Sequence, residues 1–125
     1  MAGWEIVLVA EVGEWFERLC EEDWESAELV EDAIDMLAHV GPTLGRPYAD
    51  RLKGSTNHHL KELRPGSSGR SEIRIIFTFD PIRRAVLLVA GDKAGDWSHW
   101  YEVNIPLAEK RLAQHVAELH TREYE

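Results

Sequence analysis

A pair of strand-like segments in the middle of the chain constrains the fold more than any other feature. Residues 71–79 alternate apolar and polar side chains, which is the period of a strand with one buried face. Residues 85–90 are apolar at every position, as in a central strand that is covered on both faces. The turn-forming residues Asp80 and Pro81 lie between the two segments. This pattern predicts two neighbouring strands at the centre of a sheet.

One strand and two helices are expected before these two segments. Residues 4–9 are β-branched and apolar, which is typical of a strand. Apolar side chains then recur at helical spacing over residues 11–21, and a second helical stripe ends at Gly41 and Pro42. Residues 41–57 are rich in glycine, proline and polar residues, and we expect them to form a loop.

A short strand over residues 59–64 and a closing helix from about Pro106 complete the order β-α-α-β-β-β-α. This order predicts a two-layer α+β fold, with a mostly antiparallel sheet and the helices packed on one face. The length of 125 residues suits a single domain that spans residues 1–125.

Neither a membrane span nor an export signal is expected in this chain. No apolar run approaches the roughly 20 residues that cross a bilayer, and the N-terminus lacks the basic region of a signal peptide. The single cysteine, Cys20, cannot form an internal disulfide, which suits a reducing compartment. We therefore expect a cytoplasmic protein with no membrane partner.

Charge is distributed unevenly along the chain, although the net charge is -9. Residues 1–40 contain twelve acidic residues and one basic residue, Arg18. Residues 51–93 contain nine basic residues and four acidic ones. Because local charge sets the field at a cleft, we expect an anionic ligand to bind at this basic middle segment.

Four basic side chains of this segment are candidates for binding phosphate. Arg74 alternates with the apolar core positions, so it stands on the open face of the sheet if the helices cover the other face. Arg64 and Lys61, on the neighbouring short strand, point to opposite sides of it. Lys93 follows the central strand directly. Arginine offers a planar fork to a phosphate, and lysine offers a point charge that can also give up a proton.

The sequence does not decide the roles of the histidine and aromatic residues around the basic segment. The six histidines show no metal-binding spacing. His58 and His59 are adjacent, so on a strand they face opposite ways and form a poor chelating pair, but either can contact phosphate. Trp97, Trp100 and Tyr101 follow the basic segment and either stack on bases or pack in the core.

The joint order of several short motifs resembles the RelE/HigB-like toxins of type II toxin–antitoxin systems, specifically the phage-derived Gp49-like branch of the RelE/ParE superfamily. The motifs are LKGS at 52–55, LKELRP at 60–65, GR at 69–70, IRIIFTFDP at 73–81 and LLVAGDK at 87–93, followed by Trp97, Trp100-Tyr101, Ile105-Pro106, Ala108-Glu109 and Arg111. The resemblance covers residues 50–112 strongly, and the N-terminal part by order of elements only.

This resemblance implies a RelE-like microbial RNase fold and an activity against mRNA, commonly on the translating ribosome. It also implies neutralisation by a cognate antitoxin, typically a helix-turn-helix protein of the HigA type. The usual chemistry needs neither a metal ion nor a cofactor, because the RNA 2′-OH attacks the adjacent phosphate and leaves a cyclic phosphate and a 5′-OH.

The resemblance also implies roles for particular residues. Arg64 and Arg74 look like the arginines that bind phosphate and stabilise its charge, and Lys93 resembles a basic position implicated in cleavage. Lys61 or Lys93 would be the general base, and His58 or Tyr101 the general acid. The expected RNA-binding residues are Lys53, Arg70, His58 and Tyr101.

Two alternatives to an mRNA endoribonuclease keep the same fold. One is a ParE-like toxin that inhibits DNA gyrase without cutting RNA. The other is a non-catalytic protein-binding module, for which the acidic residues 1–40 offer an interaction surface to a basic partner. The overall acidic charge departs from what is usual for nucleases of this kind, which tend to be basic.

Overall fold

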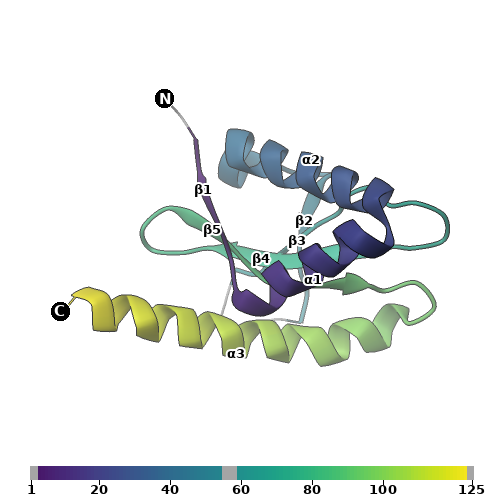
Figure 1. Cartoon of the computed structure of the whole chain (residues 1–125). Helices are drawn as coiled ribbons and strands as arrows, with labels where there is room; N and C mark the ends of the chain where they lie inside the picture. The colour runs from purple at the N-terminus through teal and green to yellow at the C-terminus, as the bar shows by residue number, and fades with distance from the viewer. Residues whose placement is uncertain (1–2, 55–58, 124–125) are drawn as a thin grey trace.

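The computed structural model describes residues 3–54 and 59–123, which form a central sheet with helices above and below it (Figure 1). The elements in chain order are β1 (Glu5–Leu8), α1 (Ala10–Glu22), α2 (Trp24–Val40), the short 3-10 helix η1 (Gly41–Thr43), β2 (Ala49–Arg51), β3 (Lys61–Leu63), β4 (Ile73–Phe79), β5 (Arg84–Asp92) and α3 (Trp97–Glu123). The expected α+β class is confirmed.

The sheet has five strands in the order β1-β5-β4-β3-β2. β1 runs parallel to β5, and the other three neighbouring pairs are antiparallel, which confirms the mostly antiparallel sheet. The expected loop over residues 41–57 was wrong in part, because Ala49–Arg51 form the edge strand β2 against β3. A three-residue edge strand carries too short a pattern to be recognised among glycines and prolines.

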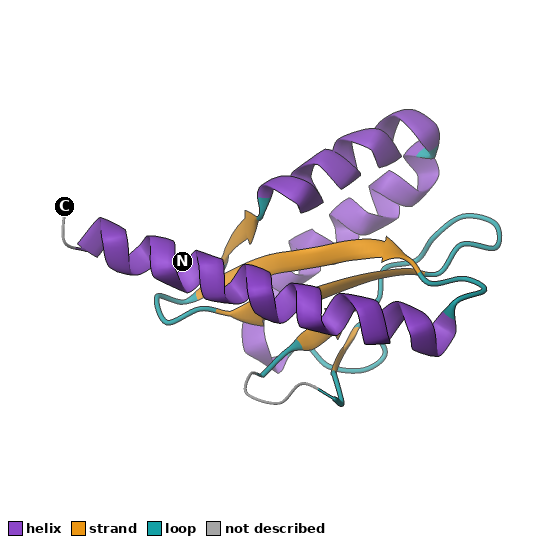
Figure 2. Ribbon diagram, turned by 90° about the horizontal axis from the view of Figure 1, so that it is seen from below, coloured by secondary structure: helices purple, strands orange, loops and turns teal. Residues whose placement is uncertain are grey.

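The helices cover both faces of the sheet, so the expected packing on one face was wrong. α1 and α2 lie on one face and α3 lies on the other, as Figures 1 and 2 show. The buried residues on the α1–α2 side include Val12, Val30, Leu37, Leu63, Ile73, Ile75, Phe77 and Leu87. Those on the α3 side include Leu60, Ile76, Val86, Leu88, Val89, Trp100, Ile105, Ala108 and Leu112. The physical reason is that β5 is apolar on both faces, and both must be kept from water.

Helix α3 starts at Trp97 and not near Pro106, which lies inside the helix. Its first turn begins where the Trp100 N–H donates to the Asp96 carbonyl oxygen at 2.7 Å. The early start places the aromatic residues at 97, 100 and 101 on the helix, over the end of the sheet where β3 ends and β4 begins. Within the described ranges, no helix combines the length and the apolar character that a bilayer crossing requires.

Candidate active site

A buried glutamate, Glu62, lies at the centre of a polar cluster between the sheet and the start of α3. Only 3% of its surface is exposed. The Arg64 Nε donates to its Oε1 at 2.8 Å, and the Tyr101 hydroxyl donates to its Oε2 at 2.6 Å. The Arg74 Nε lies 3.9 Å from Oε1. A carboxylate this deeply buried needs such partners, because removal from water strongly disfavours an unpaired charge.

The strand registers bring these residues to the face that α3 covers. Glu62 pairs with Ile76 across β3 and β4. Arg64 lies two residues after Glu62 and Arg74 lies two residues before Ile76, so both share this face. Arg74 is paired in turn with Gly91 on β5. A Cβ atom at Gly91 would lie 3.1 Å from the Trp100 Nε1, so the absence of a side chain there lets the indole pack close to the sheet.

A β-bulge in the pairing of β4 with β5 directs Lys93 to the same face. The register shifts between Ile76 and Phe77, so that Leu88 and Val89 both contribute to the core on the α3 side. A bulge of this kind changes which later residues face a given side. After the bulge, every second residue from Val89 onward faces α3. Gly91 and Lys93 are therefore on this face, beside Arg74. Without the bulge, Lys93 would point toward α1 and α2.

The Lys93 side chain is enclosed by aromatic rings. The residue is only 6% exposed, and its Nζ lies 4.2 Å from the ring centroid of Trp97 and 5.1 Å from that of Tyr101. Burial lowers the pKa of Lys93, and the positive charge of Arg74 lowers it further, although Glu62 and Glu72 act in the opposite direction. Lys93 therefore releases its proton more readily than a lysine in water does.

Tyr101, in contrast to Lys93, releases its proton less readily than the free side chain does in water. Burial raises the pKa of its hydroxyl, and the hydrogen bond to Glu62 raises it further. The phenol therefore keeps its proton and serves as a hydrogen-bond donor.

One donor of Arg74 lies within ion-pair distance of Glu62 but makes no hydrogen bond within the described ranges. Its Nε is buried and makes no hydrogen bond to any described residue, while one of its terminal nitrogens, Nη1, donates to the Ile73 carbonyl oxygen at 2.8 Å. A buried donor without an acceptor is costly, so an oxygen brought to this position by a ligand would gain a strong, charge-assisted hydrogen bond.

Comparison with known proteins identifies the family. The family described as "Phage derived protein Gp49-like (DUF891)" matches residues 14–113. The chain belongs to this family. It is 47% identical over 110 residues to the putative toxin HigB2 of Mycobacterium tuberculosis (strain ATCC 25618 / H37Rv), which covers 88% of this chain and 53% of the relative. It is 46% identical over 115 residues to the putative toxin HigB3 of the same organism, covering 92% of this chain and 96% of the relative.

The chain thus spans about half the length of HigB2 and nearly all of HigB3. No solved structure matches the chain. The expected resemblance to HigB-like toxins of the Gp49-like branch is confirmed.

In this Gp49-like chain the structure brings together Arg64, Arg74, Lys93 and Tyr101 of the predicted site residues. Lys61 does not join them. It pairs with Phe77 on the α1–α2 face, where its Nζ donates to the Pro42 carbonyl oxygen at 3.1 Å.

The remaining predicted residues lie at the margins of the cluster or outside the description. Lys53 is exposed and lines a hollow next to Tyr101. Arg70 is exposed on the loop between β3 and β4. His58 lies outside the described residues. The roles of these three residues stay predictions.

The sequence analysis missed Glu62, although a signal for it was present. Glu62 and Arg64 are two residues apart on one short strand, so they share a face. A carboxylate on the face that carries Arg64 and Arg74 is expected to pair with them. The sequence left open whether Trp97 is exposed or packs in the core. Its contact with Lys93 was not predicted, because α3 begins earlier than its apolar pattern indicated.

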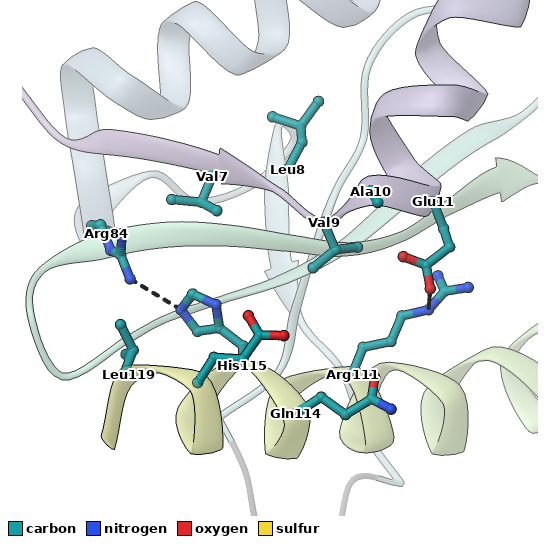
Figure 3. A pocket seen from close by; sticks show the side chains of 11 residues that line it. Val7, Leu8, Val9, Ala10, Glu11, Arg84, Arg111, Gln114, His115 and Leu119 are labelled. Carbon is teal, nitrogen blue, oxygen red and sulfur yellow. Dashed lines mark hydrogen bonds and ion pairs between the residues drawn. The ribbon is translucent and has the colours of Figure 1, made fainter. Parts of the chain in front are cut away.

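A second polar cluster attaches α3 to the other end of the sheet. The buried Asp80 Oδ2 lies 2.9 Å from the Arg84 Nε and 3.0 Å from the His115 Nε2. A cavity of about 310 Å³ lies between β1 and α3. Figure 3 shows His115 and Arg84 on one side of it, and Arg111 paired with Glu11 on the other. Because these basic side chains already contact acidic groups of the chain itself, we interpret this end as structural.

Replacing Asp80 by asparagine is expected to lower the free energy of unfolding at neutral pH by roughly 2–3 kcal/mol, since two buried donors then lose a charged acceptor. Burial acts to raise the pKa of Asp80, but the hydrogen bonds from His115 and Arg84 outweigh it and hold the pKa below its usual value. A group with a lowered pKa stabilises the fold above its unfolded pKa, and this contribution is lost as the pH falls through the folded pKa.

Urea unfolding at neutral and at acidic pH tests this expectation. The difference between the wild type and Asp80→Asn is expected to shrink in acid. Asp35→Asn, at an exposed position on α2, is the matched control and is expected to change stability by less than about 0.5 kcal/mol. Equal stability of wild type and Asp80→Asn at neutral pH would show that this cluster does not hold α3.

Proposed function

We propose that this chain is the toxin of a type II toxin–antitoxin system and that it cleaves mRNA at the cluster around Glu62. The observation that carries the proposal is the convergence of two arginines, a lysine with a lowered pKa and a tyrosine on one end of the sheet. The HigB names of the similar proteins support the toxin role.

Cleavage without a metal requires three contributions. A base must take the 2′ proton, cations must stabilise the negative charge that develops on the phosphate oxygens, and an acid must protonate the departing 5′ oxygen. Arg64 and Arg74 supply the cations, and the Nε of Arg74, which makes no hydrogen bond to a described residue, is a donor that a phosphate oxygen would satisfy. Their guanidinium groups are held in place by Glu62, so little reorganisation is needed when the substrate arrives.

Lys93 supplies the base in this proposal. Its lowered pKa gives a larger neutral fraction near pH 7 than an ordinary lysine has. After it accepts the 2′ proton, the resulting ammonium returns a proton to the 5′ oxygen. Tyr101, which was expected as a candidate acid, has a raised pKa. It therefore donates a hydrogen bond to the phosphate or to Glu62 without giving up its proton.

The partners follow from the same proposal. The mRNA is cut while bound to the ribosome, which holds most of the substrate, so a chain of net charge -9 has to bind only the few nucleotides around the cut itself. A helix-turn-helix antitoxin of the HigA type neutralises the toxin in the cytoplasm.

Inducing the protein in cells and mapping the 5′ ends of mRNA tests the proposal. New cuts within coding regions are expected with the wild type, and far fewer are expected with Lys93→Met, which keeps the length and apolar stem of the side chain but removes its charge and its proton acceptor. Arg18→Met, at an exposed position on α1, is the control and is expected to cut as the wild type does.

The other outcomes separate the competing functions. Growth arrest with intact mRNA would refute the nuclease and favour inhibition of DNA gyrase. Normal growth with intact mRNA would favour a non-catalytic binding protein.

A further inference from the structure

Trp97 presents an exposed indole at the mouth of the proposed active site. It is the first residue of α3, and 56% of its surface is exposed. Its ring contacts the Lys93 ammonium at 4.2 Å, so the most deeply buried cation of the cluster lies directly beneath it. The exposed indole offers a flat apolar surface at the edge of a cluster of cations.

The indole is held in place by the cluster and not by burial in the core. Lys93 contacts both Trp97 and Tyr101, which lie one helical turn apart on α3. The attraction between an ammonium and an aromatic ring fixes the position of the ring. Much of the surface of Trp97 still remains open to solvent.

We propose that Trp97 is a stacking platform for a nucleobase of single-stranded RNA, adjacent to the phosphate that Arg64 and Arg74 bind. This proposal rests on the proposed function and adds to it a subsite for a base. Every nucleobase has a flat π face, so stacking on tryptophan favours single-stranded RNA with little preference for sequence. The base and the Lys93 ammonium would lie against the same indole.

The surroundings of Trp97 distinguish it from the other highly exposed tryptophan. Trp24 is 61% exposed at the start of α2, on the opposite face of the sheet, and the exposed acids Glu25 and Glu28 are close to it in the helix. Trp97 also follows an exposed acid, Asp96, but its ring contacts the Lys93 ammonium, so an anionic strand is attracted there and repelled at Trp24. Trp24 is therefore a matched control for the loss of an exposed indole.

Binding of a short 2′-O-methyl oligonucleotide, which lacks the attacking 2′-OH, tests the proposal. Trp97→Ala is expected to weaken binding by roughly 5- to 150-fold, the usual range for the loss of one base–aromatic stack. Trp97→Phe is expected to lose less, because a stacking ring remains. Trp24→Ala is expected to bind as the wild type does. Circular dichroism spectra and melting temperatures establish that the variants are folded.

An abasic oligonucleotide of the same length separates stacking from an effect on Lys93. If Trp97 stacks on a base, the wild type and Trp97→Ala bind the abasic strand equally. Equal weakening on the abasic strand would overturn the proposal, because the indole would then act only by holding Lys93. Unchanged binding of the intact strand by Trp97→Ala would overturn it as well. The proposed function is tested by a different result from the stacking proposal: it is refuted if the wild type cuts no mRNA in cells.

Discussion

Replacing Arg74 by alanine is expected to lower the rate of mRNA cleavage by about 10²–10³-fold and to abolish growth arrest. Removal of one preorganised donor that stabilises developing negative charge typically has an effect of this size. Arg74 is suited to this role, because its Nε is a buried donor without a hydrogen-bond partner among the described residues. It lies next to Lys93, whose pKa it helps to lower.

Two comparisons make this prediction specific. Arg74→Lys keeps the charge but loses the planar fork, so it is expected to retain only part of the activity. Arg18→Ala removes an exposed arginine from α1 and is expected to cleave and to arrest growth as the wild type does. Rates are measured on a reconstituted translation reaction, with thermal unfolding as a check on the fold. Wild-type rates with folded Arg74→Ala would contradict the proposed site.

The sequence predicts the strands and helices of this chain better than it predicts their packing. The hairpin at residues 71–90 is visible because alternation and full burial each leave a clear pattern. Because β5 is apolar on both faces, each face of the sheet needs a covering layer. The sequence of the largely polar helix α3, however, does not show against which face of the sheet it packs. Short edge strands such as β2 depend on a partner strand and leave almost no local pattern.

Part of the site could be predicted, because the basic side chains of β3, β4 and the residue after β5 are set by strand alternation and by resemblance to a family. What could not be predicted depends on contacts between distant segments. The bulge that directs Lys93 toward Arg74 has no local sequence signal. The position of Trp97 over Lys93 follows from where α3 begins and how it lies on the sheet. Lys61 was placed with the other cations by family resemblance, although alternation puts it on the other face.

Replacing Glu62 by alanine is expected to lower the free energy of unfolding by about 3–5 kcal/mol, a large effect for a single substitution. Removing one partner of a buried ion pair leaves the other charge uncompensated. Here the loss removes the carboxylate between the two guanidinium groups, although Arg64 keeps its ion pair with Asp50, and it deprives the Tyr101 hydroxyl of its acceptor. Urea unfolding measures the change, and Glu72→Ala, near the same end of the sheet but less buried, is the matched control.

The milder variant Glu62→Gln separates stability from function. The amide keeps an acceptor for Tyr101 but carries no charge, so it no longer competes with a phosphate for the two guanidinium groups. It also holds those groups less firmly, which weakens preorganisation for the transition state. We therefore expect Glu62→Gln to bind a non-cleavable RNA more tightly than the wild type and to cleave mRNA more slowly. Weaker binding together with slower cleavage would show instead that Glu62 acts only by maintaining the fold of the site.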